Sequence, residues 1–340
     1  MPIKISEIAK KINAVVIGNK NIKISSIASF TANKTYSKKN NPVIVFISKY
    51  DIDENKTPKN TTFLLNKTVY EKFKQPDKFN FLISEDTKLS FALLTNLFKE
   101  KTTTPKYQIL HPNSYKLLVG RNVSIGLNFK YGSNCLIEDN VTIGDNVSIE
   151  NNVIIHHGTI IGNNVIIRSG SIIGSEGFGN VLTSDKSWCH IAHLGNVILK
   201  NDIDIGANCC IDRATLDSTV INSGVIIDNL VHIAHNVIIG ENTAIAAKVG
   251  IAGSCSIGKR NMIGGMTGII DHIKTADDVV ISATSSVTTN INEPGHYTGI
   301  MPISKHAKWK RMAFWLTKLD KILKKFSINK DINNESNEYK

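Results

Sequence analysis

The sequence predicts a mainly β protein: a parallel β-helix of hexapeptide repeats, with a small α+β domain before it and a helical segment after it. The first observation is a repeat of six residues. Isoleucine recurs at this step from Ile221 to Ile269. An earlier run extends from Ile125 to Ile173, and Tyr131 is its only member that is not isoleucine. Helices and strands repeat at about 3.6 and 2 residues, so neither explains this period.

The second observation is a small or β-branched residue four positions after each member of the repeat, as at Val141, Val147, Val225 and Val231. Both positions are expected to point inward, while Gly, Asn and Asp between them turn the corners. Each hexapeptide then forms one side of a prism. The repeat is interrupted at residues 174–196 and by four extra residues near Asp217, which we expect to form loops on the outer surface.

The flanking segments lack this period. Within residues 1–104, patterns predict a helix over 6–12, strands over 22–27, 43–47, 63–65 and 79–83, and a second helix capped by Asp86, hence an α+β domain. Residues 105–296 form the predicted β-helix, 297–327 a helical segment and 328–340 a disordered tail. Apolar residues in the helical segment are spaced alternately three and four apart, which predicts packing against symmetry mates. These residues are Trp309, Met312, Leu316, Leu319, Leu323 and Phe326.

Composition narrows the class of protein. The 340 residues carry a formal charge of +11, which favours an acidic partner. The chain has neither an apolar stretch long enough to cross a membrane nor a signal-peptide core, so a cytoplasmic location is expected. Cys135, Cys209 and Cys255 fall on inward positions, and no cysteine has zinc-site spacing. Nucleic acid is not expected as a partner, because the basic residues are not interleaved with stacking aromatics.

The repeat also predicts where the histidines lie relative to one another. Three hexapeptides make one coil, so residues 18 apart stack at about 4.8 Å per coil. His235 follows an inward isoleucine by two positions, Gly253 lies one coil above it, and His272 lies near the same corner two coils above. A histidine beside an unobstructed glycine N–H offers a base and an oxyanion donor, two parts needed for acyl transfer. Asp228 and Asp271 are candidate orienters of the imidazoles.

Two other interpretations of these histidines stay open. A polar residue at a corner is most often solvated surface. A zinc site would need three nitrogens, and His232, His235 and His272 could supply them. However, His232 and His235 need not converge, because an inward residue lies between them. The sequence therefore predicts no metal.

Several stretches resemble the UDP-3-O-acylglucosamine N-acyltransferases of lipid A biosynthesis. They are residues 224–229, 233–236, 251–254, 262–265 and 293–295, the Gly177-Phe178-Gly179 insertion, and Asp212-Arg213-Ala214 with Leu216-Asp217. The resemblance covers nearly the whole chain. It implies a left-handed β-helix, a homotrimer, and transfer of a 3-hydroxyacyl group from acyl carrier protein to the 2-amino group of a UDP-sugar. It implies no bound cofactor, the 4'-phosphopantetheinyl carrier being a co-substrate, and at most peripheral membrane contact through the lipid-like product.

The resemblance also implies roles for individual residues. His235 matches the general base, the Gly253 N–H matches the oxyanion donor, and His272 matches a histidine near the substrate. Asp228, Phe178 and Gly179 are further candidates for substrate binding.

In this family a Phe-x-x-Asn-x-x-Tyr pattern holds the uracil. The corresponding stretch here, from Phe46 to Tyr50, is shorter and lacks the asparagine. Phe46 and Tyr50 could stack on a base or could form a core pair at a strand end. Lys248, near the active coils, stands where the family usually carries an uncharged residue.

Two surface features extend this interpretation. Lys305, Lys308, Lys310 and Arg311 form a basic strip suited to docking an acidic acyl carrier protein. Small residues over 283–286, including Ala283 and Ser286, predict an acyl channel open to long chains.

Three alternative functions remain. A UDP-N-acetylglucosamine O-acyltransferase has a His-x-x-His motif like that of His232 and His235, but it lacks the N-terminal domain and the Gly-Phe-Gly insertion. A non-catalytic trimeric β-helix scaffold predicts that no activity depends on His235. A zinc hydratase of the same fold predicts sensitivity to chelators.

Overall fold

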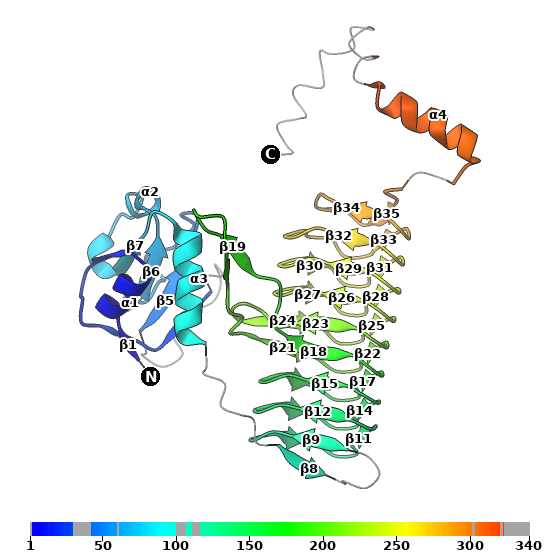
Figure 1. Ribbon diagram of the computed structural model, residues 1–340, viewed down its shortest axis with the longest axis horizontal. Helices are drawn as coiled ribbons and strands as arrows, with labels where there is room; N and C mark the ends of the chain where they lie inside the picture. Colours follow the sequence, from blue (N-terminus) through cyan, green and yellow to red (C-terminus); the bar gives the residue numbers. More distant parts are fainter. Residues whose placement is uncertain are drawn as a thin grey trace. The chain divides into compact units, whose positions relative to one another are not determined.

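The computed structural model describes residues 2–29, 42–59, 61–99, 107–110, 116–300, 303–319 and 322. Residues 1–299 form one compact unit and residues 300–340 a second. Figure 1 shows the coils of the solenoid stacked one on another within the first unit. The predicted disordered tail, and the end of the apolar seam at Leu323 and Phe326, lie outside the described residues.

The N-terminal part contains a five-stranded sheet in the order β2-β7-β6-β5-β4, parallel except for β2. Its strands are β2 Val15–Ile17, β4 Ser26–Ala28, β5 Val43–Phe46, β6 Thr61–Leu65 and β7 Asn80–Ile83, and a separate pair joins β1 Ile3–Lys4 and β3 Lys23–Ile24. The helices are α1 Ile5–Lys11, α2 Lys67–Tyr70 and α3 Thr87–Phe98, with a 3₁₀ turn at Pro76–Lys78. As predicted, Asp86 caps α3 by accepting a hydrogen bond from the Leu89 N–H.

The solenoid has three parallel sheets, with an antiparallel strand, β8, added at one end of the third, and most coils contribute a strand to each. Pairing follows the predicted arithmetic, because Ser124 pairs with Thr142 and His232 with Gly250, each 18 residues further on. The chain is therefore mainly β, with a parallel β-helix of hexapeptide repeats, as the sequence predicts. The first sheet consists of β10 Ser124–Ile125, β13 Thr142–Ile143, β16 Ile160–Ile161, β21 Asn196–Leu199, β24 Ser218–Ile221, β27 Ile238–Ile239 and β30 Ser256–Ile257.

The other two sheets have more strands. The second consists of β11 Lys130–Tyr131, β14 Ser148–Ile149, β17 Ile166–Ile167, β22 Asp204–Ile205, β25 Ile226–Ile227, β28 Ala244–Ile245, β31 Met262–Ile263, β33 Val279–Ile281 and β35 Gly295–Tyr297. The third consists of β8 Gln108–Leu110, β9 Leu117–Val119, β12 Cys135–Ile137, β15 Ile154–Ile155, β18 Ile172–Ser175, β23 Cys210–Asp212, β26 His232–Ile233, β29 Gly250–Ile251, β32 Gly268–Ile269 and β34 Ser286–Val287.

The corners depend on left-handed backbone. Asparagine occupies most of them in the early coils, where Asn122, Asn134 and Asn140 have φ of 55°, 54° and 60°. Asparagine tolerates this conformation better than most residues do. In the later coils other residues stand in it, among them Lys248 and His272, with φ of 61° and 62°. The inward isoleucines and valines, together with the three predicted cysteines, form one continuous buried core.

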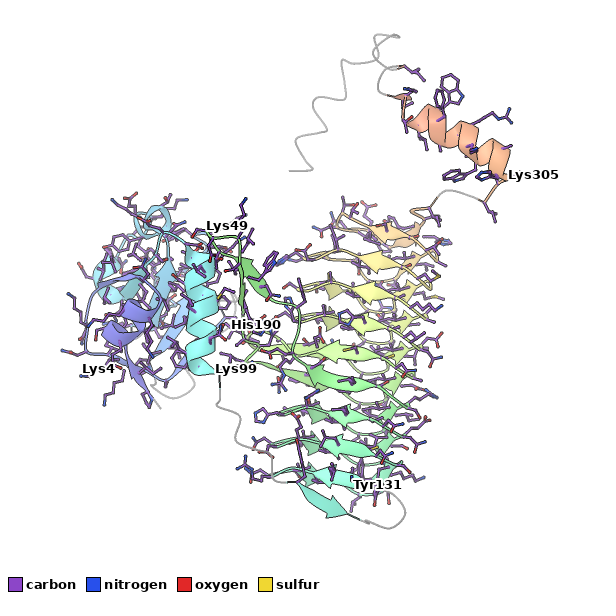
Figure 2. The ribbon with its side chains drawn as sticks, in the orientation of Figure 1. Lys4, Lys49, Lys99, Tyr131, His190 and Lys305 are labelled. Atoms are coloured by element: carbon purple, nitrogen blue, oxygen red, sulfur yellow. The ribbon has the colours of Figure 1, made fainter. Side chains whose placement is uncertain are left out.

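Both predicted interruptions form outer structure. Residues 174–196 contain an antiparallel hairpin of β19 Asn180–Leu182 and β20 Trp188–His190. This hairpin contacts α3 of the N-terminal part, where Asn96 Nδ2 donates to the His190 carbonyl at 2.7 Å and Ala192 N donates to Thr95 Oγ1 at 3.1 Å. Figure 2 labels Lys99 and His190 at this contact. The four extra residues near Asp217 shift the pairing of Asn196 to Ser218, which lies 22 positions further on.

Candidate functional site

A groove of about 660 Å³ follows the upper coils of the third sheet. The outward positions of four neighbouring strands, His232, Gly250, Gly268 and Ser286, are in register along it. Glycine has no side chain, so Gly250 and Gly268 leave the middle of the groove floor open, and a Cβ at either would meet no atom within 4 Å. His235, Gly253, His272 and Phe178 also line the groove, as do Asp212, Ala234, Ile251, Ala252, Ser254, Ile269, Ile270 and Asp271.

His235 and Gly253 lie as the repeat predicts. A Cβ built on Gly253 would approach both Cε1 and Nε2 of His235 to 2.6 Å, so the imidazole covers this glycine closely. Within the described residues the Gly253 N–H donates no hydrogen bond, whereas its carbonyl accepts one from His272 N at 3.0 Å. A ring nitrogen and an unused amide donor therefore lie side by side at the groove.

The orientation of His235 comes from Asn236. His235 Nδ1 lies 3.1 Å from Asn236 Oδ1, and this oxygen also accepts a hydrogen bond from Thr215 N at 2.9 Å. The amide nitrogen of Asn236 donates to the Leu216 carbonyl at 2.8 Å, so the amide is held at both ends. Because an amide oxygen only accepts, Nδ1 carries the proton and Nε2 keeps its lone pair. Nε2 and its neighbour Cε1 are the ring atoms that lie above Gly253.

Within the single chain, Asp228, one of the two candidate orienters of the imidazoles, does not contact His235. Asp228 lies on a different side of the prism, and its Oδ1 accepts hydrogen bonds from the backbone and side chain of Asn229 at 2.7 and 3.0 Å. Asp271 does line the groove, but its nearest imidazole nitrogen is His272 Nε2, at 4.0 Å. Sequence reasoning missed Asn236 because it looks like one more corner asparagine, with φ of 60°.

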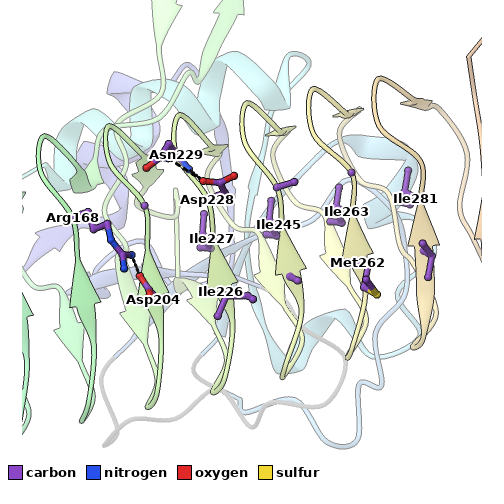
Figure 3. Close-up of a pocket in the computed structure, with 15 residues that line it drawn as sticks. Arg168, Asp204, Ile226, Ile227, Asp228, Asn229, Ile245, Met262, Ile263 and Ile281 are labelled. Atoms are coloured by element: carbon purple, nitrogen blue, oxygen red, sulfur yellow. Dashed lines mark hydrogen bonds and ion pairs between the residues drawn. The ribbon is translucent and has the colours of Figure 1, made fainter.

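Asp228 belongs instead to a second groove, of about 650 Å³, on the second sheet. In Figure 3, Arg168 pairs with Asp204 at one end, and Ile227, Ile245, Ile263 and Ile281 mark successive strands. The outward Ile226 and Met262 are 55% and 58% exposed, so this face is apolar and uncovered in the single chain.

His193 is a residue that sequence reasoning did not single out. Its ring lies 5.1 Å from that of His235, centroid to centroid, in an edge-to-face arrangement. Burial, and then the charge that His235 would carry, lower the pKa of His193 to about 4, so this imidazole is neutral at pH 7. Gly177 and Gly179 cover it, since a Cβ on Gly179 would come within 2.7 Å of His193 Cε1. Gly179 thus makes room for His193, while the neighbouring Phe178 is 86% exposed at the groove.

The structure does not bring Phe46 and Tyr50 together. Phe46 stacks on Phe91 at 4.9 Å, against one hydrophobic cluster of the N-terminal part. Tyr50 packs edge-on against Phe73 at 5.3 Å, against the other cluster. Side chains alternate between the faces of β5, which places Phe46 on the first cluster, whereas Tyr50 lies beyond the end of this strand. The two rings therefore do not form one platform for a base.

Glu54 anchors Tyr50 and suggests a test of the N-terminal part. Its carboxylate accepts hydrogen bonds from Tyr50 OH at 2.6 Å, Lys74 N at 2.7 Å and Gln75 N at 2.8 Å. These bonds outweigh burial and lower the pKa of Glu54, whereas the bond to Glu54 is the main cause that raises the pKa of Tyr50 to about 12.

We expect Glu54→Gln to destabilise the protein by about 1–3 kcal/mol at pH 7, because backbone donors lose a charged acceptor. A lowered pKa means stability that is present above the unfolded value of about 4.3 and is lost as pH falls through the folded value. The difference from the parent should therefore shrink below about pH 4. Urea unfolding at pH 7 and pH 3.5, with the exposed Glu85→Gln as control, measures it. An equal difference at both pH values contradicts the prediction.

The predicted acyl channel needs a correction. Ser286 lines the groove on the third sheet, whereas Ala283 is not among the lining residues. Ser285, counted among the outward residues, points inward and is 3% exposed. Ser285 stands four positions after Ile281. In the earlier coils the residue four positions after each inward isoleucine also points inward, so the same rule places Ser285 in the core.

The basic strip lies on or beside α4 His306–Leu316, in the second compact unit. Lys305 precedes this helix, and the described side chains of Lys308, Lys310 and Arg311 are exposed. Of the predicted apolar seam, Trp309, Leu316 and Leu319 are 48%, 54% and 48% exposed in the single chain.

The zinc site weighed for His232, His235 and His272 does not form in the described part of the chain. Two other groups bring three possible ligand atoms within 4.8 Å of one another: Glu176, His190 and His193, and Cys210, Asp212 and His232. Among the described helices, none is long and apolar enough to cross a membrane.

A comparison with protein families agrees with the hexapeptide repeat of the solenoid. Residues 140–175 match the bacterial transferase hexapeptide (six repeats) family. The pairing of the strands shows that the solenoid is built of hexapeptide repeats. The chain is 46% identical over 142 residues to a UDP-3-O-acylglucosamine N-acyltransferase of Bordetella avium, covering 41% of this chain and 39% of that protein.

Further relatives carry the same name. The identity is 50% over 127 residues with the Bordetella pertussis protein, covering 37% of this chain and 35% of the relative, and 42% over 154 residues with that of Hahella chejuensis, covering 45% and 44%. The matches thus span about two fifths of the relatives' length. A solved Francisella novicida UDP-N-acetylglucosamine acyltransferase is 21% identical with a TM-score of 0.49, covering 58% of this chain and 71% of that one.

Proposed function

We propose that this protein is an N-acyltransferase, which moves a 3-hydroxyacyl group from acyl carrier protein to the 2-amino group of a UDP-3-O-acylglucosamine in lipid A biosynthesis. The observation that carries the proposal is the juxtaposition of His235 Nε2 with the free Gly253 N–H in the groove. The name shared by relatives that are 42–50% identical supports the choice of substrate.

The proposed reaction needs a base and an oxyanion donor. The amine nitrogen attacks the thioester carbonyl, a C–N bond forms, and the nitrogen gives its proton to His235 Nε2. The carbonyl oxygen gains negative charge, which the Gly253 N–H stabilises. The C–S bond then breaks, and the leaving carrier thiolate takes the proton from His235, which restores the neutral base. His235 needs the neutral tautomer for this step, and its hydrogen bond to Asn236 favours that tautomer.

His272 and Phe178 are proposed to contact the substrate, because both line the groove around His235. For Phe46 and Tyr50 we propose contact with the uracil by one ring at most, since they pack on different clusters.

A homotrimer is proposed as the assembled form. The second sheet exposes Ile226 and Met262, the first exposes Ile160 and Ile238 at 41% and 44%, and α4 exposes Trp309. Burying such side chains between copies would remove apolar surface from water. Lys308, Lys310 and Arg311 on α4, with Lys305 beside it, are proposed to attract the acidic carrier protein, an effect that salt would weaken.

The experiment that tests the function compares two acceptors with a 3-hydroxyacyl carrier protein as donor. Turnover of UDP-3-O-acylglucosamine without turnover of UDP-N-acetylglucosamine supports the proposal. The reverse preference would identify the O-acyltransferase. An inactive protein that still forms trimers would favour the non-catalytic scaffold.

The open groove floor predicts a preference for long acyl donors. If the chain lies along Gly250, Gly268 and Ser286, nothing bulky stops it. Gly268→Ile places a β-branched residue on a strand that tolerates it and fills the floor. We expect kcat/KM for a long donor to fall at least tenfold more than for a short one, measured with carrier proteins bearing acyl chains of graded length. Equal losses for both donors would place the acyl chain elsewhere.

A further inference from the structure

The buried His193 has two ring nitrogens that need hydrogen-bond or metal partners. His193 is 5% exposed, and neither ring nitrogen makes a hydrogen bond of normal geometry with the described residues. Buried polar atoms in folded proteins are nearly always paired, so an orphaned pair of nitrogens indicates a missing ligand, water or ion. The identity of the missing partner can be inferred from the groups that surround the ring.

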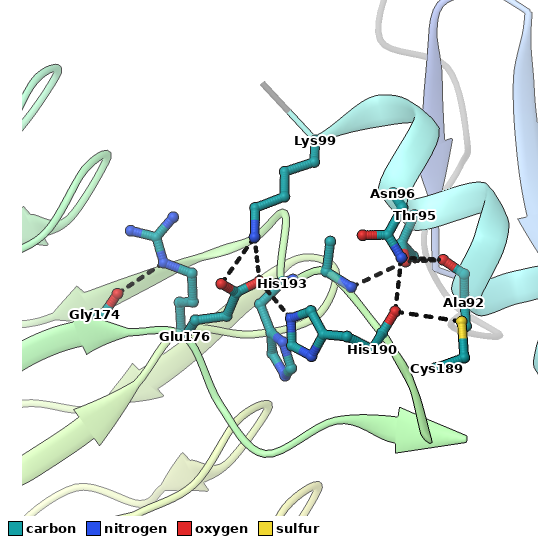
Figure 4. Close-up of polar contacts among 11 residues, drawn as sticks. Ala92, Thr95, Asn96, Lys99, Gly174, Glu176, Cys189, His190 and His193 are labelled. Carbon is teal, nitrogen blue, oxygen red and sulfur yellow. Dashed lines mark hydrogen bonds and ion pairs between the residues drawn. The ribbon is translucent and has the colours of Figure 1, made fainter. Parts of the chain in front are cut away.

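Two metal-binding side chains lie beside His193. Each of Glu176, His190 and His193 offers one ligand atom, and these atoms all lie within 4.8 Å of one another. A tetrahedral ion with bonds of about 2.0–2.1 Å needs its ligands roughly 3.3 Å apart, so small side-chain rotations would suffice. Figure 4 shows the three side chains converging at the base of the hairpin.

The backbone around the cluster is firmly held. The Ala192 N–H bonds to Thr95, and the His190 carbonyl accepts a hydrogen bond from Asn96, so α3 fixes the segment that carries both histidines. Lys99 Nζ lies 3.1 and 3.0 Å from the two oxygens of Glu176. Carboxylate ligands commonly accept such outer hydrogen bonds, which set their orientation.

We propose that Glu176, His190 and His193 form a site for one transition-metal ion of the Zn²⁺ type. Two imidazoles and a carboxylate suit Zn²⁺, Co²⁺ or Ni²⁺ and do not suit Mg²⁺ or Ca²⁺. To bind, the ion displaces the present 2.9 Å hydrogen bond between His190 Nε2 and Glu176 Oε1, and takes a lone pair from His193. The site lies outside the acyl-transfer chemistry, which needs no metal.

The ion would have a structural role: it would hold the segments around His235 in place. His193 packs on the ring of His235, and the glycines of the Gly177-Phe178-Gly179 loop pack on His193. An ion on His193 would therefore link the loop, the hairpin and α3 behind the base. The second cluster, at Cys210, Asp212 and His232, does not compete equally, because Asp212 already accepts a 2.6 Å hydrogen bond from Ser175 and no member of that cluster is an orphaned buried group.

The test is a titration of chelator-treated full-length protein with Zn²⁺ by calorimetry, and with Co²⁺ by visible absorption. We expect one ion per chain, a Co²⁺ spectrum typical of four-coordinate binding, and no response to Mg²⁺. His193→Gln and His190→Gln should each weaken binding at least tenfold. The matched control His232→Gln, in the other cluster, should bind like the parent.

Two outcomes would overturn the proposal. One is absence of Zn²⁺ binding at tens of micromolar. The other is binding that His232→Gln abolishes and His190→Gln leaves intact, which would place the ion at Cys210, Asp212 and His232. Because His190 is only half-buried, its variant keeps the test decisive if His193→Gln fails to fold. Binding is measured without acyl transfer, so failure of the proposed function leaves this result intact.

Discussion

Replacing His235 by glutamine should reduce the rate of acyl transfer by roughly two to four orders of magnitude, the usual contribution of a general base. Glutamine approximates the size of the imidazole but cannot accept the proton of the attacking amine. In the proposed mechanism His235 acts in the transition state rather than in ground-state binding, so the loss should appear in kcat with little change in KM. Steady-state kinetics with saturating donor, with the thermal midpoint of each protein measured in parallel, give the comparison.

The chain offers a matched control in His157. It follows the inward Ile155 by two positions, as His235 follows Ile233, so it stands at the same corner of a lower coil. His157→Gln should keep full activity. If both variants kept full activity, the proposed mechanism would fail even if the enzyme class were right. If both lost it equally, the effect would come from the corner structure rather than from the base.

Gly253→Ala is expected to lower kcat/KM by roughly ten- to a hundredfold while leaving stability nearly unchanged. The added methyl group would stand 2.6 Å from the imidazole of His235, so the ring must move away from the position above the amide. Displacing a catalytic group by about 1 Å can cost on the order of a hundredfold. The pH profile of kcat/KM should keep its shape, because the base is displaced and not removed.

Gly250 provides the comparison for this variant. It lies on the same groove, three residues earlier, and a methyl group there meets no atom within 4 Å. Gly250→Ala should therefore have an effect several times smaller, measured with the same donor and acceptor. Similar losses at the two glycines would mean that the groove, and not the contact with His235, sets the rate.

The regular coils were predictable because their repeat converts position in the sequence into position in space. Inward residues, corner residues and the stacking of Gly253 on His235 all follow from counting in sixes and eighteens. The same rule would have placed Ser285 in the core. The α+β part was predictable for β5, β6, β7 and the Asp86 cap, whose signals are local. The sequence did not predict β2, and the strand predicted over 22–27 is divided between β3 and β4, which lie in different sheets.

Counting could not identify the partners of His235. Asp228 was a reasonable orienter by residue type, but it turns to another side of the prism, and the neighbouring Asn236 takes that role. Phe46 and Tyr50 are close in sequence, but they pack on different clusters. In both cases side-chain direction, which depends on local backbone geometry, decides the contact.

By itself, the sequence determined the solenoid, its core and the stacking of Gly253 on His235, because a periodic fold repeats one local geometry without reference to distant segments. Only the tertiary structure decided that His193 lies against His235 and beside Glu176 and His190. Glu176, His190 and His193 lie in the irregular insertion at residues 174–196, which follows no period. The path of that insertion is set by its packing on α3.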